Sequence, residues 1–376
     1  MPFKRFRSII AIMATTFKQV LQKETNAFFT LNKSNRVWHI PLLAALSVGM
    51  PLIAGLLLGN LKASLTASLG GLVILYYAPS IPLAGRMITL LACSFGFMLS
   101  YTIGHCFSFN PYASAIVFGL WAMAVHWIVS FFKTRAPGNF FFIMMASMAS
   151  CQPFDLHHIP QKIGLMGLGT MWACMLALVY GLLTLHKQTP SPHNNKLSVT
   201  IVKNEYTSLV ESGIMGFFMF SALLIGHLLA FKNPYWIPIS CLAVMQGVSR
   251  LHIWQRVVHR IVGTFVGLCL CWLALSISKT PLSICISIIL LQFIVESLIV
   301  RHYALAVIFI TPMTILLAEA GNPLIQDPNH LLAARVTDII VGSMIGAIGG
   351  WVIYHEKLRQ SAIRQIRKTK VLIHRR

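Results

Sequence analysis

Charged residues are scarce in this sequence. Only 10% of its 376 residues are Asp, Glu, Lys or Arg, and just 9 are acidic, whereas an ordinary soluble domain carries roughly 25% charged residues. So small a charged fraction excludes a soluble globular enzyme. The hydrophobic fraction of 56% also excludes intrinsic disorder, which requires low hydrophobicity.

Motifs for nucleotide hydrolysis and for other enzymatic chemistry are also missing. The sequence has no phosphate-cradling P-loop, no Gly-x-Ser-x-Gly elbow, no His-Glu-x-x-His and no paired carboxylates, so we expect no enzyme. Its eight cysteines form no Cys-x-x-Cys pair, and most lie within apolar runs, where a thiol behaves as a small hydrophobic group. We therefore expect no cofactor and no metal site.

The most prominent feature of the sequence is its long apolar runs. A membrane-spanning helix needs about 20 apolar residues to cross a hydrocarbon core of ~30 Å. The predicted fold class is therefore all-α, a polytopic membrane protein with about twelve transmembrane helices in two six-helix repeats. The expected spans are 39–59, 63–79, 87–107, 112–132, 138–152, 163–185, 210–231, 234–249, 258–278, 281–300, 301–318 and 332–355.

These spans divide the chain into five parts. Apolar residues recur at helical spacing near the start, which predicts an amphipathic helix on the cytoplasmic membrane surface. The predicted parts are an amphipathic N-terminal segment (1–38), a first six-helix repeat (39–185), a cytoplasmic linker (186–209), a second six-helix repeat (210–356) and a basic cytoplasmic tail (357–376).

The formal net charge of +21 fits this topology. Twelve spans place 25 of the 30 Lys and Arg residues on one side of the membrane and 5 on the other. Basic residues collect in cytoplasmic loops, so both termini are predicted to be cytoplasmic. Attraction to anionic lipid then explains the charge, and we expect a lipid bilayer rather than a nucleic acid as the partner.

The two halves of the chain resemble each other. Arg86-Met87-Ile88-Thr89 aligns with Arg260-Ile261-Val262-Gly263, and Gly169-Thr170-Met171 matches Gly342-Ser343-Met344 near the end of each half. A duplicated six-span unit is the economical explanation, and both copies would start on the cytoplasmic side.

One series of residues in the second half carries a family resemblance. It comprises Tyr235-Trp236, Gln246, Arg256, Arg260-x-x-Gly263-Thr264-x-x-Gly267, Thr311 and Arg335-x-x-Asp338-x-x-x-Gly342. The series resembles the fusaric acid resistance (FUSC) family, which includes the aromatic carboxylic acid efflux pumps, over roughly residues 39–356. The resemblance implies a bacterial inner-membrane exporter. Many members carry a large cytoplasmic domain between the halves, where this chain has only 186–209.

Several of these residues have both a structural and a functional interpretation. Gly263, Gly267, Gly342 and Gly346 form small helix faces that allow close helix packing. Basic residues at the predicted cytoplasmic mouth either follow the positive-inside rule or attract an organic anion. The mouth residues that we expect to act on an anion are Arg256, Arg260 and Arg301.

The remaining candidates lie deeper in the predicted bundle. Tyr235 and Trp236 either anchor an aromatic belt or line the route of an aromatic substrate. Glu296 either belongs to a buried ion-pair network or is a protonatable carboxylate coupled to export. Arg335 and Asp338 form either a structural clamp or a gate. Gln246 and Thr311 match family positions and complete the candidate substrate and gating residues.

The predicted function is secondary export of small organic anions, with aromatic carboxylic acids as the expected substrates, across the bacterial inner membrane. Two alternatives stay open: a passive organic-anion channel, because plant aluminium-activated malate channels look similar in fold, and a non-transporting envelope scaffold. A periplasmic membrane-fusion adaptor, implied by the resemblance alone, and a second copy of the chain remain open as partners.

Overall fold

The computed structural model describes residues 37–134, 136–185, 205–247, 249–277, 280–319 and 328–356, together with 360, 361 and 364. The predicted amphipathic segment (1–38), the linker (186–209) and the basic tail (357–376) lie outside the described residues, apart from a few positions at their edges.

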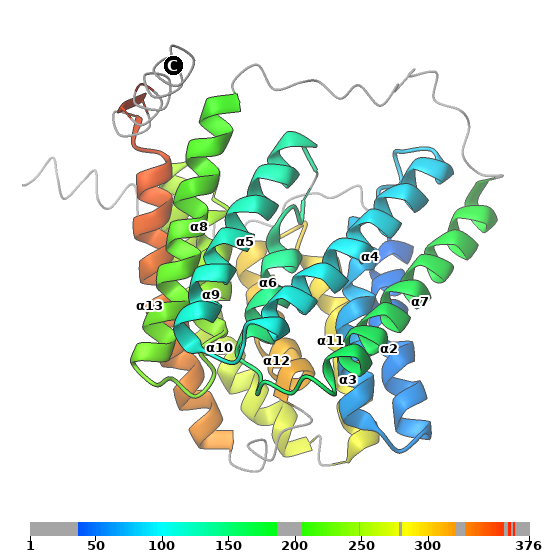
Figure 1. Ribbon diagram of the computed structural model, residues 1–376. Coiled ribbons are helices and arrows are strands. Elements are labelled where there is room, and N and C mark those ends of the chain that lie inside the picture. The colour runs from blue at the N-terminus through cyan, green and yellow to red at the C-terminus, as the bar shows by residue number, and fades with distance from the viewer. Residues whose placement is uncertain are drawn as a thin grey trace, which may run out of the picture.

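The described part of the chain is all-helical and contains no β-strand. Twelve α-helices and one 3-10 helix follow one another along it (Figure 1). They are α2 (His39–Leu57), α3 (Leu61–Gly71), η1 (Leu72–Tyr76), α4 (Leu83–Cys106), α5 (Pro111–Phe131), α6 (Phe140–Ser150), α7 (Ile159–Leu185), α8 (Glu205–Leu228), α9 (Trp236–Met245), α10 (Arg250–Ile277), α11 (Pro281–Leu298), α12 (Tyr303–Glu319) and α13 (Pro328–Ile353).

Helix lengths separate these elements into two classes. Eight are long and apolar enough to cross a membrane, namely α2, α4, α5, α7, α8, α10, α11 and α13. The other apolar helices are shorter, and they are the second and fifth of each half: α3 with η1, α6, α9 and α12. The chain is thus a multi-pass membrane protein. Complete crossing by the four short helices stays a prediction.

Local sequence explains where two of the long helices begin. The Asn110 side chain accepts hydrogen bonds from the first turn of α5, and Pro111 occupies the first helical position. Thr280 and Pro281 do the same for α11, where Thr280 and Ser283 form a capping box. A polar cap satisfies backbone N–H groups that have no partner within the helix, and proline at this position loses no hydrogen bond.

One predicted boundary was clearly wrong. The span expected at 258–278 begins at Arg250 as α10, because residues 250–257 are helical although several are polar. Hydropathy detects the part of a helix that lies in lipid, not the helix itself. Arg256 and Arg260 therefore lie on the second and third turns of a continuous helix.

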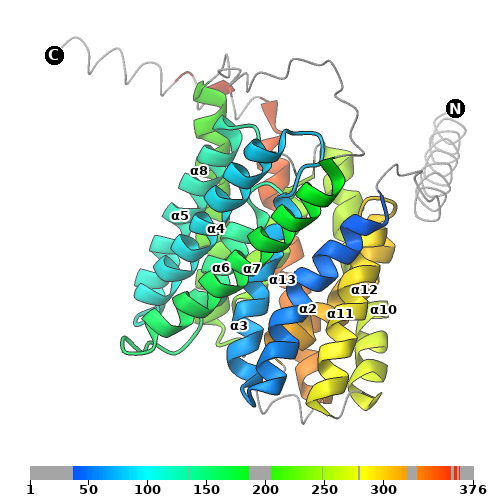
Figure 2. The same ribbon diagram turned by 90° about the vertical axis from the view of Figure 1, so that its right-hand side faces the viewer.

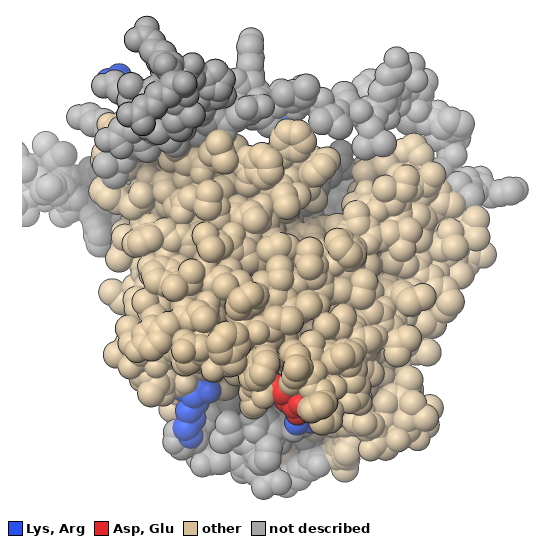
Figure 3. Space-filling model, in the orientation of Figure 1, with Lys and Arg blue, Asp and Glu red and all other residues tan. Residues whose placement is uncertain are grey.

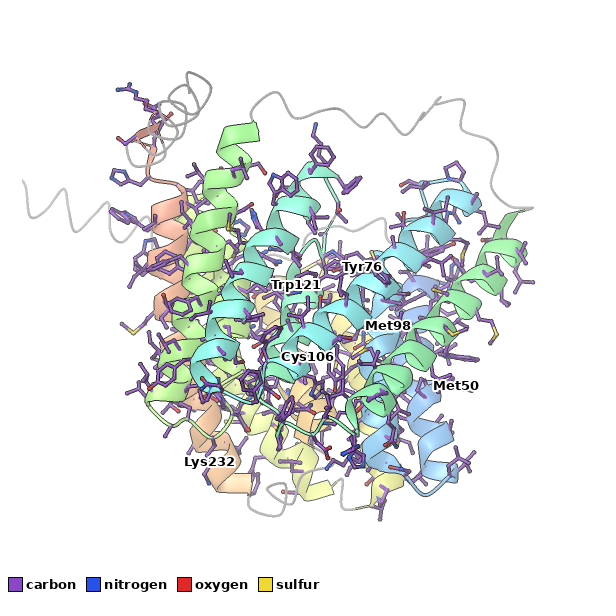
Figure 4. The ribbon with its side chains drawn as sticks, viewed as in Figure 1. Met50, Tyr76, Met98, Cys106, Trp121 and Lys232 are labelled. Carbon is purple, nitrogen blue, oxygen red and sulfur yellow. The ribbon has the colours of Figure 1, made fainter. Side chains whose placement is uncertain are left out.

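The short helices are the most deeply buried elements. All ten residues of α9 are buried, as are nine of the eleven residues of α6. Tyr76, labelled in Figure 4, ends η1, and its hydroxyl donates a hydrogen bond of 2.6 Å to the carbonyl oxygen of Gly138 just before α6. The long helices surround these elements and supply most of the surface.

Helix packing follows the same scheme in both halves. α3 packs against α7 as α9 packs against α13, and α4 packs against α6 as α10 packs against α12. Between the halves, α5 packs against α8 and α11 packs against α2. These two pairs lie on opposite sides of the molecule (Figure 2). This correspondence is what a duplicated six-helix unit would produce.

The outside of the bundle is apolar over its middle. Figure 3 shows one face on which charged side chains appear only near the ends. Lys232, labelled in Figure 4, lies in the loop between α8 and α9 at one end, called here the Lys232 end. The opposite end, with the turn between α11 and α12, is called the Arg301 end. An uncharged band between two charged ends suits a hydrocarbon environment.

Candidate functional site: arginines along a buried helix

Helix α9 is the centre of the candidate site. It is ten residues long, begins with Trp236 at the Lys232 end and contacts α6, α8, α10 and α13. Arginines from α10 and α13 reach it at three levels, although most of its own residues are apolar.

Arg335 of α13 contacts the first residue of α9. Its guanidinium carbon lies 3.3 Å from the centroid of the Trp236 ring, and Nη2 donates a hydrogen bond of 3.3 Å to the hydroxyl of Thr314 on α12. Arg335 is 2% exposed and Trp236 is 3% exposed. A guanidinium stacked on an indole away from water is a favourable cation–π contact. Trp236 is therefore an internal residue whose ring packs against a cation of the same chain.

Two arginines of α10 contact the later turns of α9. Arg260 is 8% exposed, and its Nη2 donates a hydrogen bond of 3.3 Å to the Ser240 hydroxyl. Arg256 donates a hydrogen bond of 2.9 Å to the carbonyl oxygen of Ala243, and its guanidinium carbon lies 4.8 Å from the Tyr303 ring centroid.

The three contacts lie on one side of α9. Trp236, Ser240 and Ala243 are separated by four and three residues, which is the spacing of one helix face. They span about 10 Å along the helix axis at 1.5 Å per residue. We call Arg335, Arg260 and Arg256 the arginine row. It runs inward from the Lys232 end, and two of its members, Arg260 and Arg256, are residues predicted for the cytoplasmic mouth.

Unsatisfied hydrogen-bond donors accompany the row. The buried donor groups that have no hydrogen-bond partner among the described residues include Trp236 Nε1, Arg260 Nε, Arg256 Nε and Asn233 Nδ2. A buried donor without an acceptor costs about 1–3 kcal/mol. An anion with acceptor oxygens, such as a carboxylate, could pair with these groups, because its oxygens accept hydrogen bonds and carry the opposite charge.

The comparisons with known proteins bear on the same part of the chain. Residues 221–349, from within α8 to within α13, match the family described as fusaric acid resistance protein-like. The similarity to this family is thus located in residues 221–349 of the chain. The segment contains every candidate substrate and gating residue, and the resemblance predicted from Tyr235, Trp236 and the arginine motif is confirmed there.

One curated relative is an uncharacterized membrane protein, YvaC, of Bacillus subtilis (strain 168). It is 33% identical over 146 residues, which cover 39% of this chain and 23% of that protein. The chain thus matches less than a quarter of the length of this relative. No solved structure matches the chain.

The other predicted residues within 221–349 lie in different surroundings. Arg301 is exposed at the turn after α11, two residues before Tyr303, whose ring Arg256 contacts. Glu296 is buried near the end of α11, which packs against α2 and α12. Gln246, at the end of α9, donates hydrogen bonds of 3.4 Å to the Pro137 carbonyl and the Asn139 side chain.

The remaining predicted residues of the segment contribute to helix packing. The Tyr235 carbonyl accepts a hydrogen bond of 2.9 Å from Ser147 of α6, and the Thr311 hydroxyl donates one of 2.9 Å to Val307 of its own helix. Backbone approaches closely at the four predicted glycines. A Cβ at Gly263 or Gly267 would meet α12, and one at Gly342 or Gly346 would overlap carbonyl oxygens of α9.

Four contributors to the site were not predicted as site residues: Ser240, Tyr303, Thr314 and Asn233. Ser240 and Thr314 lie in apolar runs, where a single hydroxyl gives no signal. Asn233 was recognisable, because an Asn-Pro pair directly precedes Tyr235-Trp236 in the family-like motif.

The two buried charges of α13 allow a stability prediction. Arg335 and Asp338 are 2% and 0% exposed and lie three residues apart, the default arrangement of intramembrane ionic partners. Arg335→Gln and Asp338→Asn should each lower the free energy of unfolding by about 3 kcal/mol, because each leaves the other charge buried. The double variant should lose much less than the sum. Thermal unfolding in detergent would measure this, and additive losses would contradict it.

Proposed function

We propose that the protein is a secondary transporter that exports small organic anions, aromatic carboxylates in particular, across the bacterial inner membrane. The arginine row carries the proposal. Three arginines contact successive turns of a buried helix within an apolar bundle, and donor groups without partners lie beside them. Arginine stays charged at any physiological pH, so the row maintains positive charge along α9.

The row would substitute for the hydration shell of a carboxylate. Moving an anion through hydrocarbon is unfavourable because its charge loses water. Guanidinium groups about 5 Å apart along the axis would present the next donor before the previous one is released. The ring of Trp236 would offer a stacking surface to an aromatic substrate once Arg335 turns toward the carboxylate.

Exposed Arg301 would contribute from outside the row. It lies at the end that the positive-inside rule assigns to the cytoplasm, where it would raise the local concentration of anions. The described residues contain no group of three or more His, Cys, Asp or Glu placed to hold a metal ion. The proposed mechanism uses only side chains of the chain itself.

Proteoliposomes would test the proposal directly. Purified protein would be reconstituted, and movement of labelled benzoate followed with and without an imposed proton gradient, with benzylamine as the cationic counterpart. Gradient-dependent movement of benzoate but not of benzylamine is the expected result. Movement driven by voltage alone would indicate an anion channel, and no movement with folded protein would favour a scaffold; either outcome would refute the proposal.

Glu296 is the proposed coupling residue. It is 6% exposed on α11, and a carboxylate in such surroundings can exchange a proton as the protein changes conformation. Glu296→Gln should make benzoate movement insensitive to the proton gradient while exchange of labelled for unlabelled benzoate continues. Glu356→Gln, at an exposed acid beyond α13, is the matched control and should remain coupled. Gradient-dependent benzoate movement in Glu296→Gln would show that this carboxylate is not the coupling residue.

A further inference from the structure

The first half contains a counterpart of the Arg335–Trp236 contact. Gly169 of α7 packs against the backbone of Ala67 in α3, as Gly342 of α13 packs against Ile237 in α9. Lys162 precedes Gly169 by seven residues, and Arg335 precedes Gly342 by seven residues. Thr66 directly precedes Ala67, as Trp236 directly precedes Ile237. Lys162 and Thr66 therefore occupy the places of Arg335 and Trp236.

The cation at this position is not covered by an aromatic ring from α3. Thr66 is small where Trp236 is large, and Lys162 is only half-buried, whereas Arg335 is buried. The Lys162 ammonium donates a hydrogen bond of 3.1 Å to the Gln152 side chain. Its charge also acts electrostatically on exposed Lys62 in the first turn of α3. Two cations thus lie near each other at the Lys232 end.

A buried imidazole adds an unsatisfied group to the same place. His105, in the last turn of α4, is 1% exposed, and its Nε2 has no hydrogen-bond partner among the described residues. The Lys162 charge acts on this imidazole. The ring packs edge-on against Tyr101 with centroids 4.6 Å apart, and the Tyr101 hydroxyl interacts with Gln152 and Thr66. His105, Tyr101 and Lys162 therefore belong to one polar cluster.

One acid modifies the charge of this cluster. The Asp155 carboxylate also acts on Lys162, but it is exposed and lies 2.6 Å from Nδ1 of His158. This hydrogen bond lowers the pKa of Asp155, so the carboxylate is ionised at neutral pH. Two lysines and one carboxylate leave one net positive charge, which matches a monovalent anion.

We infer that Lys162, His105 and Lys62 form a second anion site, which binds a small carboxylate at the Lys232 end of the first half. Lys162 would supply the principal charge, His105 a hydrogen bond through Nε2, and Lys62 a second, solvent-exposed charge. The inference rests on the proposed function only for the class of ligand. On that basis the site would receive the carboxylate at the end of the export route opposite Arg301.

Lysine acylation would test binding without any transport assay. Folded protein in detergent would be treated with an amine-reactive ester in sodium acetate or in sodium chloride of equal ionic strength, and each lysine would be quantified by mass spectrometry. Acetate should slow acylation of Lys162 and Lys62 by about tenfold, the effect of one charge-assisted hydrogen bond. Lys232 and exposed Lys133 serve as internal controls and should change less than twofold. Equal rates in both salts, or stronger protection by phosphate than by acetate, would overturn the inference.

Two variants separate binding from folding. His105→Phe keeps an aromatic ring beside Tyr101 but removes Nε2, and it should lose the acetate protection of Lys162. Gln152→Glu places a permanent carboxylate beside the Lys162 ammonium, so it should also abolish protection while the chain stays folded. Undiminished acetate protection in Gln152→Glu would refute the site. Acetate protection without gradient-driven benzoate movement would support the site and refute the proposed function. Benzoate movement without acetate protection would support the proposed function and refute the site.

Discussion

Arg260→Gln should reduce benzoate export by at least about 100-fold, the result expected if two charge-assisted hydrogen bonds to the substrate are lost. Arg260 is the middle member of the row, between Arg335 at Trp236 and Arg256 at Ala243. Without it an anion would face two turns of a buried helix with no cation. The initial rate of labelled benzoate efflux from proteoliposomes would measure the loss.

Two comparison variants make this result specific to the geometry of the row. Arg260→Lys keeps the charge but loses the planar fork, so it should recover only part of the rate. Arg301→Gln removes an exposed cation, so its effect should appear at low ionic strength and disappear in high salt. Export by Arg260→Gln at the wild-type rate, with the protein folded, would remove the row from the mechanism.

Gly169→Val should prevent the protein from folding. A Cβ at Gly169 would overlap the backbone carbonyl of Ala67, so α3 and α7 would have to separate over their whole contact. Backbone cannot move aside as a flexible side chain can, and overpacking of rigid contacts costs more than about 3 kcal/mol. The yield of monodisperse protein in detergent, judged by size-exclusion chromatography, would report the effect.

The same helix provides the control for this prediction. Gly164 lies five residues earlier on α7, and a Cβ there would meet nothing within 4 Å. Gly164→Val should therefore be expressed and purified like the wild type. Wild-type behaviour of Gly169→Val would show that α3 and α7 can pack at a greater distance than the one described.

Much of the fold could be predicted from apolar runs and charge. Every predicted span contains a helix, because an apolar segment in lipid has no water to bind its backbone groups and must pair them within a helix. The predicted spans at 138–152 and 234–249 were already short, and the structure makes α6 and α9 shorter still. The start of α10 was missed because its polar first turns carry no hydropathy signal.

The site was only partly predictable. Arg256 and Arg260 are four residues apart on one helix, so their joint placement follows from sequence spacing. Arg335 reaches Trp236 from a helix almost a hundred residues away, and only tertiary packing determines this contact. Exposed Arg301 was grouped with half-buried Arg256 and buried Arg260 because position along the chain does not report burial.

The helix contacts between the two halves restrict how this bundle can move. Helix α5 packs against α8 on one side, and α2 packs against α11 on the other. The two halves are therefore joined by an interface on each side of the molecule. The halves cannot separate as rigid bodies without exposing one of these two interfaces to lipid. If the proposed export uses alternating access, the movement would therefore fall to the short inner helices, with the long outer helices held in place. Cross-linking α5 to α8 and α2 to α11 would then leave the working cycle intact.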